Sequence, residues 1–354
     1  MKTNPIFALI PVLAAAFAGC GPVAAGDGFS RPEKLAADSV AVNQIIRPAR
    51  WAVSFGKAVV QSDMTDSLFY VYSLPDFRFL YTWGRRGEGP GEFAAVTVVN
   101  ARDGDTGALM LEDYRRKSIR AFAVGDSSFI PQDILPTFPD EKAFTDDRPL
   151  PGGFLGTKKL PAGSPREYFY IRSRQDGAVL DSVPLWTYVE AKYTDQGNMY
   201  SLSRLNTPKV IVRDDRIALV YEMFRHIDFY RVSPQGRLTL EKAVGEEIDE
   251  AAIERMVAAR RASSQKGVVG FAATQDYLYT LYLEFEVLDW ENKRGDIRKK
   301  TVYVYDWDGR EVRAYELERP ATDILVTADG KTLFAYNALE DFDRVYRYDL
   351  ENNL

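Results

Sequence analysis

The segment Leu68-Phe69-Tyr70-Val71-Tyr72-Ser73 is an apolar and aromatic run that stops at the turn signal Leu74-Pro75-Asp76. β-Branched and aromatic residues favour strands, and a tight turn between two such runs is typical of a hairpin. Runs of the same kind recur at residues 118–124, 167–172, 226–232, 301–306 and 344–349. All but the last are followed by a turn and a second run. The sequence therefore predicts a repeated β-hairpin.

The spacing of these runs indicates the repeating unit. Equivalent positions in the runs are Leu68, Ser118, Tyr168, His226, Thr301 and Arg344. The intervals between them are 50, 50, 58, 75 and 43 residues, and a four-stranded propeller blade takes roughly 40 to 50 residues. The longest interval contains residues 246–261, in which apolar residues recur at helical spacing. We therefore expect one amphipathic helix inserted between two blades.

The two ends of the chain complement each other. Three strands are predicted near the C-terminus, at 322–327, 332–338 and 344–349, and the chain provides no fourth strand after them. The run at residues 38–46 is suited to that place. A ring closed in this way removes an open sheet edge that would promote aggregation. The sequence predicts an all-β, six-bladed β-propeller over residues 36–354, closed by an N-terminal strand.

The first residues read as a secretion signal. Lys2 is followed by an apolar stretch that is shorter than the roughly 20 residues of a membrane span, and then by Ala18-Gly19-Cys20. This pattern resembles the lipobox of bacterial lipoproteins, although Phe17 stands where Leu is usual. The resemblance implies cleavage after residue 19, lipid attachment at Cys20 and a flexible tether over residues 20–35. The alternative is a plain secreted protein, but we expect an N-terminal lipid in the membrane.

One junction is similar to a known family. Residues 83–93 read Trp-Gly-Arg-Arg-Gly-Glu-Gly-Pro-Gly-Glu-Phe, and their second half resembles the Gly-Pro-Gly-Glu-Phe junction of NHL-like and TolB-like six-bladed propellers. Together with the lipobox, the chain resembles the TolB-like propeller lipoproteins of bacteria. This resemblance implies the fold and a cell-envelope location, and it supplies no catalytic residues. By analogy with Gram-negative lipoprotein sorting, the absence of Asp after Cys20 favours the outer membrane and leaves the leaflet open.

Composition limits the chemistry. The 354 residues include 45 Lys and Arg against 51 Asp and Glu, a net charge of -6, which does not suit a phosphate backbone, so we expect no nucleic-acid partner. One Cys and one His rule out a Cys/His zinc site and a disulfide framework. Serine hydrolase chemistry would need His226, and no Gly-x-Ser-x-Gly motif accompanies it. We expect a surface or fully hydrogen-bonded histidine, no catalytic residue and no cofactor.

The glycine-rich junction also has a structural interpretation. It lacks the Lys-Ser/Thr of a phosphate-binding loop, and Pro90 removes one N–H donor. We expect its glycines to allow a tight crossing and Phe93 to wedge between neighbouring sheets. A divalent cation held by acidic side chains, as in gluconolactonase-like propeller hydrolases, is the alternative function, but no ligand set can be selected from the sequence.

Loop lengths point to one working face. In a propeller, the links between blades and the links between second and third strands share a face, and here these are the long ones, including residues 84–93, 187–198 and 287–294. Function concentrates on loops that a rigid scaffold positions, and Arg and aromatic side chains are common interface anchors. We therefore predict a non-enzymatic scaffold that binds an envelope protein, peptide or glycan. The predicted binding residues are Arg85, Arg86, Glu88, Tyr114, Arg115, Tyr188, Arg225, His226 and Trp290.

Overall fold

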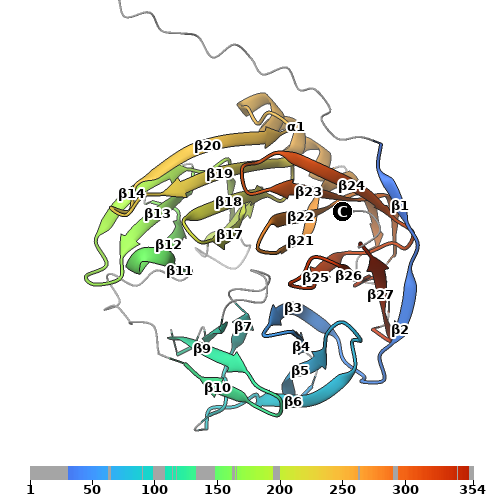
Figure 1. Cartoon of the computed structure of the whole chain (residues 1–354). Coiled ribbons are helices and arrows are strands. Elements are labelled where there is room, and N and C mark those ends of the chain that lie inside the picture. The colour runs from blue at the N-terminus through green and yellow to red at the C-terminus, as the bar shows by residue number, and fades with distance from the viewer. Residues whose placement is uncertain are drawn as a thin grey trace, which may run out of the picture.

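The protein folds as a ring of small twisted sheets around a central axis (Figure 1). The computed structural model describes residues 31–62, 65–89, 91–98, 108–113, 115–116, 118–132, 148–161, 164, 166–193, 200–261, 264–289, 294–340 and 342–350. Six of the sheets that these residues form are the blades of the ring. Five blades contain four consecutive antiparallel strands, and one of these five has an added N-terminal strand. The sixth blade contains three consecutive strands and one strand from the N-terminal segment. The predicted all-β, six-bladed propeller is confirmed.

The first three blades follow the chain from the inner to the outer strand. Blade 1 consists of β3 (Pro48–Ser54), β4 (Lys57–Ser62), β5 (Ser67–Ser73) and β6 (Phe79–Arg85). Blade 2 consists of β7 (Val96–Val98), β8 (Leu109–Asp113), β9 (Ser118–Val124) and β10 (Phe129–Pro131). Blade 3 consists of β11 (Arg148–Leu150), a 3-10 turn (Pro151–Gly153), β12 (Phe154–Lys159), β13 (Tyr168–Ser173) and β14 (Val179–Pro184).

Of the last three blades, the fifth and the sixth each take one strand from the N-terminal segment. Blade 4 consists of β17 (Lys209–Arg213), β18 (Arg216–Tyr221), β19 (His226–Val232) and β20 (Leu238–Gly245). Blade 5 consists of β21 (Ser264–Ala273), β22 (Tyr277–Asp289), β23 (Arg294–Asp306), β24 (Glu311–Leu317) and the added strand β1 (Glu33–Leu35). Blade 6 consists of β25 (Asp323–Val326), β26 (Thr332–Tyr336), β27 (Arg344–Asp349) and β2 (Asp38–Ala41).

The N-terminal segment closes the ring. β2 pairs antiparallel with β27, with Asp38 opposite Arg347 and Ala41 opposite Arg344, which confirms the predicted partner of the early strand. β1 pairs parallel with β24 on the outer edge of blade 5. β1 lies inside the segment predicted as a tether. The propeller therefore begins at Glu33, slightly before the predicted boundary at residue 36.

Insertions gather on one side of the ring. We call the side with the links between blades, and between second and third strands, the loop face, and the opposite side the turn face. The inserted helix α1 (Glu250–Arg261) joins blades 4 and 5 on the loop face, four residues later than the predicted start at 246. Between blades 3 and 4, a hairpin of β15 (Tyr188–Tyr193) and β16 (Tyr200–Leu205) replaces the expected plain loop at 187–198. β22 and β23 likewise extend into the expected loop at 287–294.

The core lies between neighbouring blades. Each of the buried apolar clusters found in the described residues joins two adjacent blades, because each sheet has apolar side chains on both of its faces. Phe93 is 1% exposed in the cluster between blades 1 and 2. Its ring lies 6.3 Å from that of Phe69 and 5.7 Å from that of Trp83. The predicted wedge at Phe93 is confirmed.

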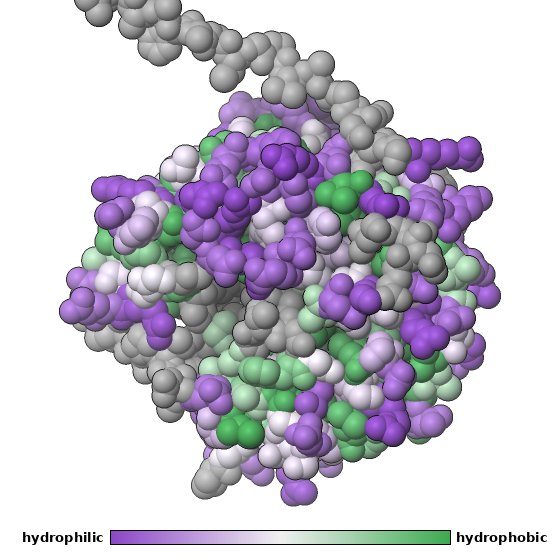
Figure 2. All heavy atoms as spheres, viewed as in Figure 1, coloured by the Kyte–Doolittle hydropathy of each residue, from purple (hydrophilic) through white to green (hydrophobic). Residues whose placement is uncertain are grey.

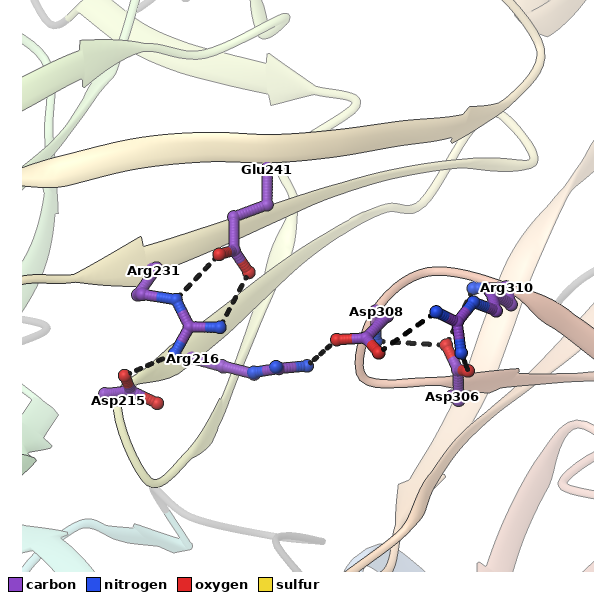
Figure 3. Close-up of polar contacts among 7 residues, drawn as sticks. All are labelled: Asp215, Arg216, Arg231, Glu241, Asp306, Asp308 and Arg310. Carbon is purple, nitrogen blue, oxygen red and sulfur yellow. Dashed lines mark hydrogen bonds and ion pairs between the residues drawn. The ribbon is translucent and has the colours of Figure 1, made fainter.

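Charged residues connect blades 4 and 5 on the turn face (Figure 3). Arg231 binds both carboxylate oxygens of Glu241, at 2.6 and 3.3 Å, and one oxygen of Asp215 at 2.6 Å. Arg216 of blade 4 binds Asp308 of blade 5 at 2.6 Å, and this hydrogen bond lowers the pKa of the Asp308 carboxyl. Exposed pairs of this kind contribute little to stability. Of these contacts, only the Arg216–Asp308 pair joins the two blades, since Arg231, Glu241 and Asp215 all belong to blade 4.

The surface in Figure 2 is uneven. Hydrophilic residues gather over the region where β18, β19 and the turn between β23 and β24 lie in Figure 1, and apolar residues are more frequent over blades 1 and 2. Among the described residues of those two blades, the large exposed apolar side chains are Phe55, Phe79 and Ile130. The described part of the chain contains no helix of the length and hydrophobicity needed to cross a membrane.

Candidate binding face

The glycine-rich junction forms a closed loop between blades 1 and 2. The carbonyl oxygen of Arg85 accepts a hydrogen bond from Phe93 N at 3.0 Å, and the carbonyl oxygen of Phe93 accepts one from Gly87 N at 3.0 Å. Gly91 has a φ of 80°, in the left-handed region that favours glycine. The loop is therefore held by its own backbone.

The side chain of Glu92 fills the inside of this loop. Its Oε2 accepts a hydrogen bond from Gly89 N at 2.9 Å. A Cβ on Gly87 would overlap the Glu92 carboxylate, so a larger residue there would require the Glu92 side chain to move. In a phosphate-binding loop, backbone N–H groups face the bound anion. Here the N–H of Gly89 donates to a carboxylate of the chain itself, in agreement with the structural interpretation of the junction.

Arg116 connects the junction to blade 2. Its Nη1 donates to the carbonyl oxygen of Glu92 at 2.9 Å, and its Nη2 donates to those of Glu88 and Gly89 at 2.8 and 3.3 Å. The buried carboxylate of Asp113 accepts hydrogen bonds from the backbone N–H groups of Arg116 and Ala94, both at 3.2 Å. Sequence reasoning missed Arg116, which lies next to the predicted Arg115, because contacts to carbonyl oxygens leave no sequence signal.

Four of the predicted binding residues meet at this junction. Arg85 and Arg86 are exposed at the end of β6. Arg115 forms an ion pair of 3.7 Å with Glu88, and both side chains are largely exposed, at 69% and 83%. The structure thus brings together Arg85, Arg86, Glu88 and Arg115, while the predicted Tyr114 lies outside the described residues.

Below the loop, Arg120 lies over the Phe93 ring, with 4.1 Å between the guanidinium carbon and the ring centre. Its Nη2 is buried and has no hydrogen-bond partner within the described residues. Burial lowers the pKa of Arg120, and the nearby Asp113 acts in the opposite direction. The positive charge therefore supports the base of the junction through its contact with an aromatic ring.

The remaining predicted residues lie around blade 4. His226 is 8% exposed, its Nδ1 donates to the carbonyl oxygen of Glu246 at 2.6 Å, and its Nε2 contacts Asp228 Oδ1 at 2.9 Å. The interpretation of His226 as a fully hydrogen-bonded histidine is confirmed. The structure places its ring inside the blade rather than on the surface of the loop face.

Arg225 and Tyr188 are half-buried, and Trp290 lies outside the described residues. The Arg225 guanidinium lies 4.9 Å from the Tyr303 ring centre, across the joint between blades 4 and 5. Burial acts to lower the pKa of Arg225, but Tyr303, Tyr305 and Glu311 raise it above its ordinary value. Tyr188 packs beside the cluster that holds α1.

The predicted residues therefore form two groups rather than one. In a six-bladed ring, the joint between blades 1 and 2 lies opposite the joint between blades 4 and 5, so the residues at the junction do not form one site with Arg225. In the described ranges, no three His, Cys, Asp or Glu side chains are close enough together to hold a metal ion.

Comparison with known proteins agrees with the fold. Residues 218–329 match the family model described as "TolB-like 6-blade propeller-like". No curated protein matches the sequence. A Bacteroides fragilis NCTC 9343 structure named "Putative exported protein" has a TM-score of 0.52 and 12% identity, over 89% of this chain and 94% of that one.

Raptor of Chaetomium thermophilum has a TM-score of 0.44 and 11% identity over 89% of this chain. The chain spans only 29% of the length of Raptor. The likeness to the Bacteroides fragilis structure shows a shared fold alone. The chain is thus a six-bladed β-propeller, and its residues 218–329 match the TolB-like 6-blade propeller-like family model.

Proposed function

We propose that the protein is a lipoprotein of the cell envelope, anchored through Cys20 and most suited to the outer membrane, whose propeller is a non-enzymatic scaffold. Its loop face binds an envelope protein, peptide or glycan. The observation that carries this proposal is the rigid construction of the insertions on that face. A surface fixed before binding loses less conformational entropy when a partner docks.

The junction loop is one such construction. Arg116 and Glu92 are used to hold it in place, whereas Arg85, Arg86 and Arg115 are exposed. The loop therefore separates side chains that build the surface from side chains that a partner can reach. Exposed arginines on a fixed base are suitable anchors, because a guanidinium binds a carboxylate through two parallel hydrogen bonds.

Helix α1 is the second rigidly held insertion on the loop face. Asp249 caps it by accepting a hydrogen bond from Ala252 N at 2.6 Å. Glu250, in the first turn, pairs with Arg166 of blade 3 at 3.2 Å. Ile248, Ala252 and Met256 are buried in the cluster between blades 3 and 4. The helix is thereby fixed over two blades.

The tether restricts the propeller to the neighbourhood of the membrane. The chain between Cys20 and Glu33 can span at most about 45 Å when fully extended. Attachment over so short a distance raises the local concentration of envelope partners. The Bacteroides fragilis structure of the same fold is named "Putative exported protein", which supports export of this chain.

Envelope fractionation tests the anchor. We expect Cys20→Ser to move the protein from the membrane fraction to the soluble fraction, because it removes the thiol that would carry lipid. Phe17→Leu, which restores the usual lipobox residue, is the control and should leave the protein in the membrane fraction. If the Cys20→Ser protein remains with the membrane, lipid attachment at this residue is wrong.

Crosslinking in native envelopes tests the binding face. A partner captured by the wild type should be lost from a variant with Arg85→Ala and Arg86→Ala. Arg319→Ala is the matched control, because Arg319 is an exposed arginine on the loop-face link between blades 5 and 6 and pairs only loosely with Glu318, at 3.8 Å. Equal capture by all three proteins would refute binding at the junction.

A further inference from the structure

Both ring nitrogens of His226 face oxygen atoms of the chain. Nδ1 lies 2.6 Å from the carbonyl oxygen of Glu246, and Nε2 lies 2.9 Å from Oδ1 of Asp228. A carbonyl oxygen can only accept a hydrogen bond, so Nδ1 must carry a hydrogen. An ionised carboxylate also only accepts, so with Asp228 ionised Nε2 carries a second hydrogen. A ring with both hydrogens is the imidazolium cation.

Tyr221 keeps Asp228 ionised. The Tyr221 hydroxyl accepts a hydrogen bond from Trp186 N at 3.5 Å and is itself hydrogen-bonded to the Asp228 carboxylate. Burial, and then the negative charge of Asp228, raise the pKa of Tyr221 well above its ordinary value. The hydroxyl therefore retains its hydrogen and donates it to Asp228. A hydrogen bond donated to a carboxylate favours the charged form.

The pair of His226 and Asp228 lies inside the joint between blades 3 and 4. His226 and Tyr221 are register partners, and their ring centres lie 5.4 Å apart. Asp228 follows two residues later on β19 and therefore lies on the same face of the blade. His226 is 8% exposed and Asp228 is 6% exposed. A charge buried to this degree is costly unless it is paired, and here each charge has the other as its partner.

The other ionisable groups around His226 come from the elements packed against it. They are Tyr230 on β19, Arg225 before it, Glu246 in the link to α1, Asp249 and Glu250 at the start of α1, and Arg166 and Glu167 of blade 3. Glu167 is buried and alternates with Phe169 of the cluster between blades 3 and 4. Arg225 lies over the Tyr303 ring at the joint with blade 5. Carboxylates outnumber guanidinium groups in this set, which favours a positive charge on the ring.

The imidazolium holds the segment that leads into α1. Glu246 lies shortly before Glu250, the first residue of α1. Its N–H donates to the carbonyl oxygen of Arg225 at 2.7 Å, and its carbonyl oxygen accepts from His226. Ile248, further along this link, is buried in the cluster between blades 3 and 4. A neutral imidazole has only one N–H group, so it could not donate to both Glu246 and Asp228.

We infer that His226 is a pH-dependent contact, a cation in the folded protein whose deprotonation releases the start of α1. The proton that leaves is that of Nδ1, and it passes to water. Nε2 keeps its hydrogen, because a hydrogen bond to a charged acceptor such as Asp228 is the stronger one. The lone pair of Nδ1 then faces the carbonyl oxygen of Glu246, and that contact becomes repulsive. Helix α1 on the loop face is therefore held firmly at lower pH and loosened as the pH rises. This inference is independent of lipid attachment and of any partner.

Nuclear magnetic resonance of the full-length protein tests the charge. His226 is the only histidine of the chain, so protein with isotope-labelled histidine, made without a histidine tag, gives the signals of one imidazole. The chemical shifts of the two ring nitrogens distinguish the cation from either neutral tautomer. At about pH 7.5 an exposed histidine is about 90% neutral, whereas we expect His226 to be mainly cationic. A neutral ring at this pH would overturn the inference.

An Asp228→Asn variant assigns the source of the charge. It keeps the shape and one acceptor oxygen but removes the negative charge, so His226 should be mainly neutral at about pH 7.5. Asp214→Asn is the matched control, because Asp214 belongs to the same blade, is largely exposed and pairs only loosely with Arg213, at 3.7 Å. The control should leave His226 cationic. A cationic ring in the Asp228→Asn protein, or loss of the cation in both variants, would reject the pair. Circular dichroism checks folding, and if Asp228→Asn does not fold, the wild-type measurements decide.

Hydrogen exchange of the wild type tests the release. After correction for the intrinsic effect of pH on exchange, the protection of the amides over residues 246–253 should fall at least about tenfold as His226 loses its proton. The amides of β26 in blade 6 are the internal control and should keep their protection. Constant protection at the start of α1 while His226 titrates would refute the release. An equal fall in α1 and β26 would show global unfolding and would also contradict the inference.

Discussion

The guanidinium of Arg347 donates a hydrogen bond of 2.8 Å to the carboxylate of Asp38, a residue 309 positions earlier in the chain. The two residues are register partners in the pairing of β27 with β2. The last blade is thus completed by a strand from the beginning of the described chain. Since the pair is exposed, the closure depends on the backbone pairing and on the buried residues beside it.

Val42 is suited to testing this closure. Its N–H donates to the carbonyl oxygen of Asp343 at 2.7 Å, and its side chain is buried between blades 6 and 1. We expect Val42→Pro to lower the free energy of unfolding by about 1–3 kcal/mol more than Val42→Ala does, because only proline removes the donor. Urea unfolding measures the difference. Equal losses would mean that packing alone holds β2.

Phe93 should be among the residues of blades 1 and 2 whose replacement by Ala lowers the free energy of unfolding most. Its ring is buried among Phe69, Trp83 and Phe122, so Phe93→Ala should lower the free energy of unfolding by about 3–5 kcal/mol. Phe79→Ala is the control. Because Phe79 is 37% exposed, this change should lower the free energy of unfolding clearly less. A similar loss for both variants would contradict the role of Phe93 as a wedge.

Gly87 and Glu92 should be energetically coupled. Gly87→Ala places a methyl group against the Glu92 carboxylate and should destabilise the wild type. In a Glu92→Ala background the same change should cost less, with a coupling free energy of about 0.5–3 kcal/mol. A double-mutant cycle by chemical unfolding gives this value. Additive effects would show that the two groups do not compete for space.

Arg116 and Arg115 should differ in their effect on the junction. Arg116→Ala removes the donors to three carbonyl oxygens, and hydrogen bonds of charged groups contribute about 1.5–3 kcal/mol. Arg115→Ala breaks one exposed ion pair and should change stability by less than about 1 kcal/mol. Amide exchange of Gly87, Gly89 and Phe93 should rise only in the Arg116 variant. Equal exchange in both would place the support of the loop elsewhere.

Tyr315 should contribute to alkaline unfolding. Burial raises the pKa of its hydroxyl from 10.0 to about 12 in the folded protein. The folded state therefore holds a proton that the unfolded state releases, so this contribution to stability is complete below pH 10 and is lost as the pH rises from 10 through 12. Tyr315→Phe should make the decline in unfolding free energy over that range shallower. An unchanged slope would assign the alkaline loss to other tyrosines.

The difference between prediction and structure at α1 has a specific cause. Helical spacing extends back to residue 246, but the backbone of Glu246 is already engaged: its N–H donates to the carbonyl oxygen of Arg225 at 2.7 Å and its carbonyl oxygen accepts from His226. The helix starts only after Asp249, which caps it. A tertiary contact thus overrode the local pattern. The hairpin of β15 and β16 was assigned to the loop between blades 3 and 4, although residues 189–193 and 200–203 alternate between apolar and polar residues.

The binding residues show the same limit. Arg85, Arg86, Glu88 and Arg115 were predicted from residue type and loop length, and the structure brings them together. His226 was selected on the same grounds and is buried. Residue type suggests what a side chain can bind, whereas exposure depends on neighbours such as Asp228 and Glu246 that the local pattern does not reveal.

The sequence by itself determined the number of blades, the strand that closes them, the inserted helix and the turns between strands, because these depend on short-range patterns of apolar residues and on turn chemistry. Only the tertiary structure decided that Arg116 holds the junction, that Arg225 lies at the joint opposite it, and that His226 contacts the link to α1. The physical reason is that these features are contacts between distant segments. Their partners are chosen by the packing of the whole ring.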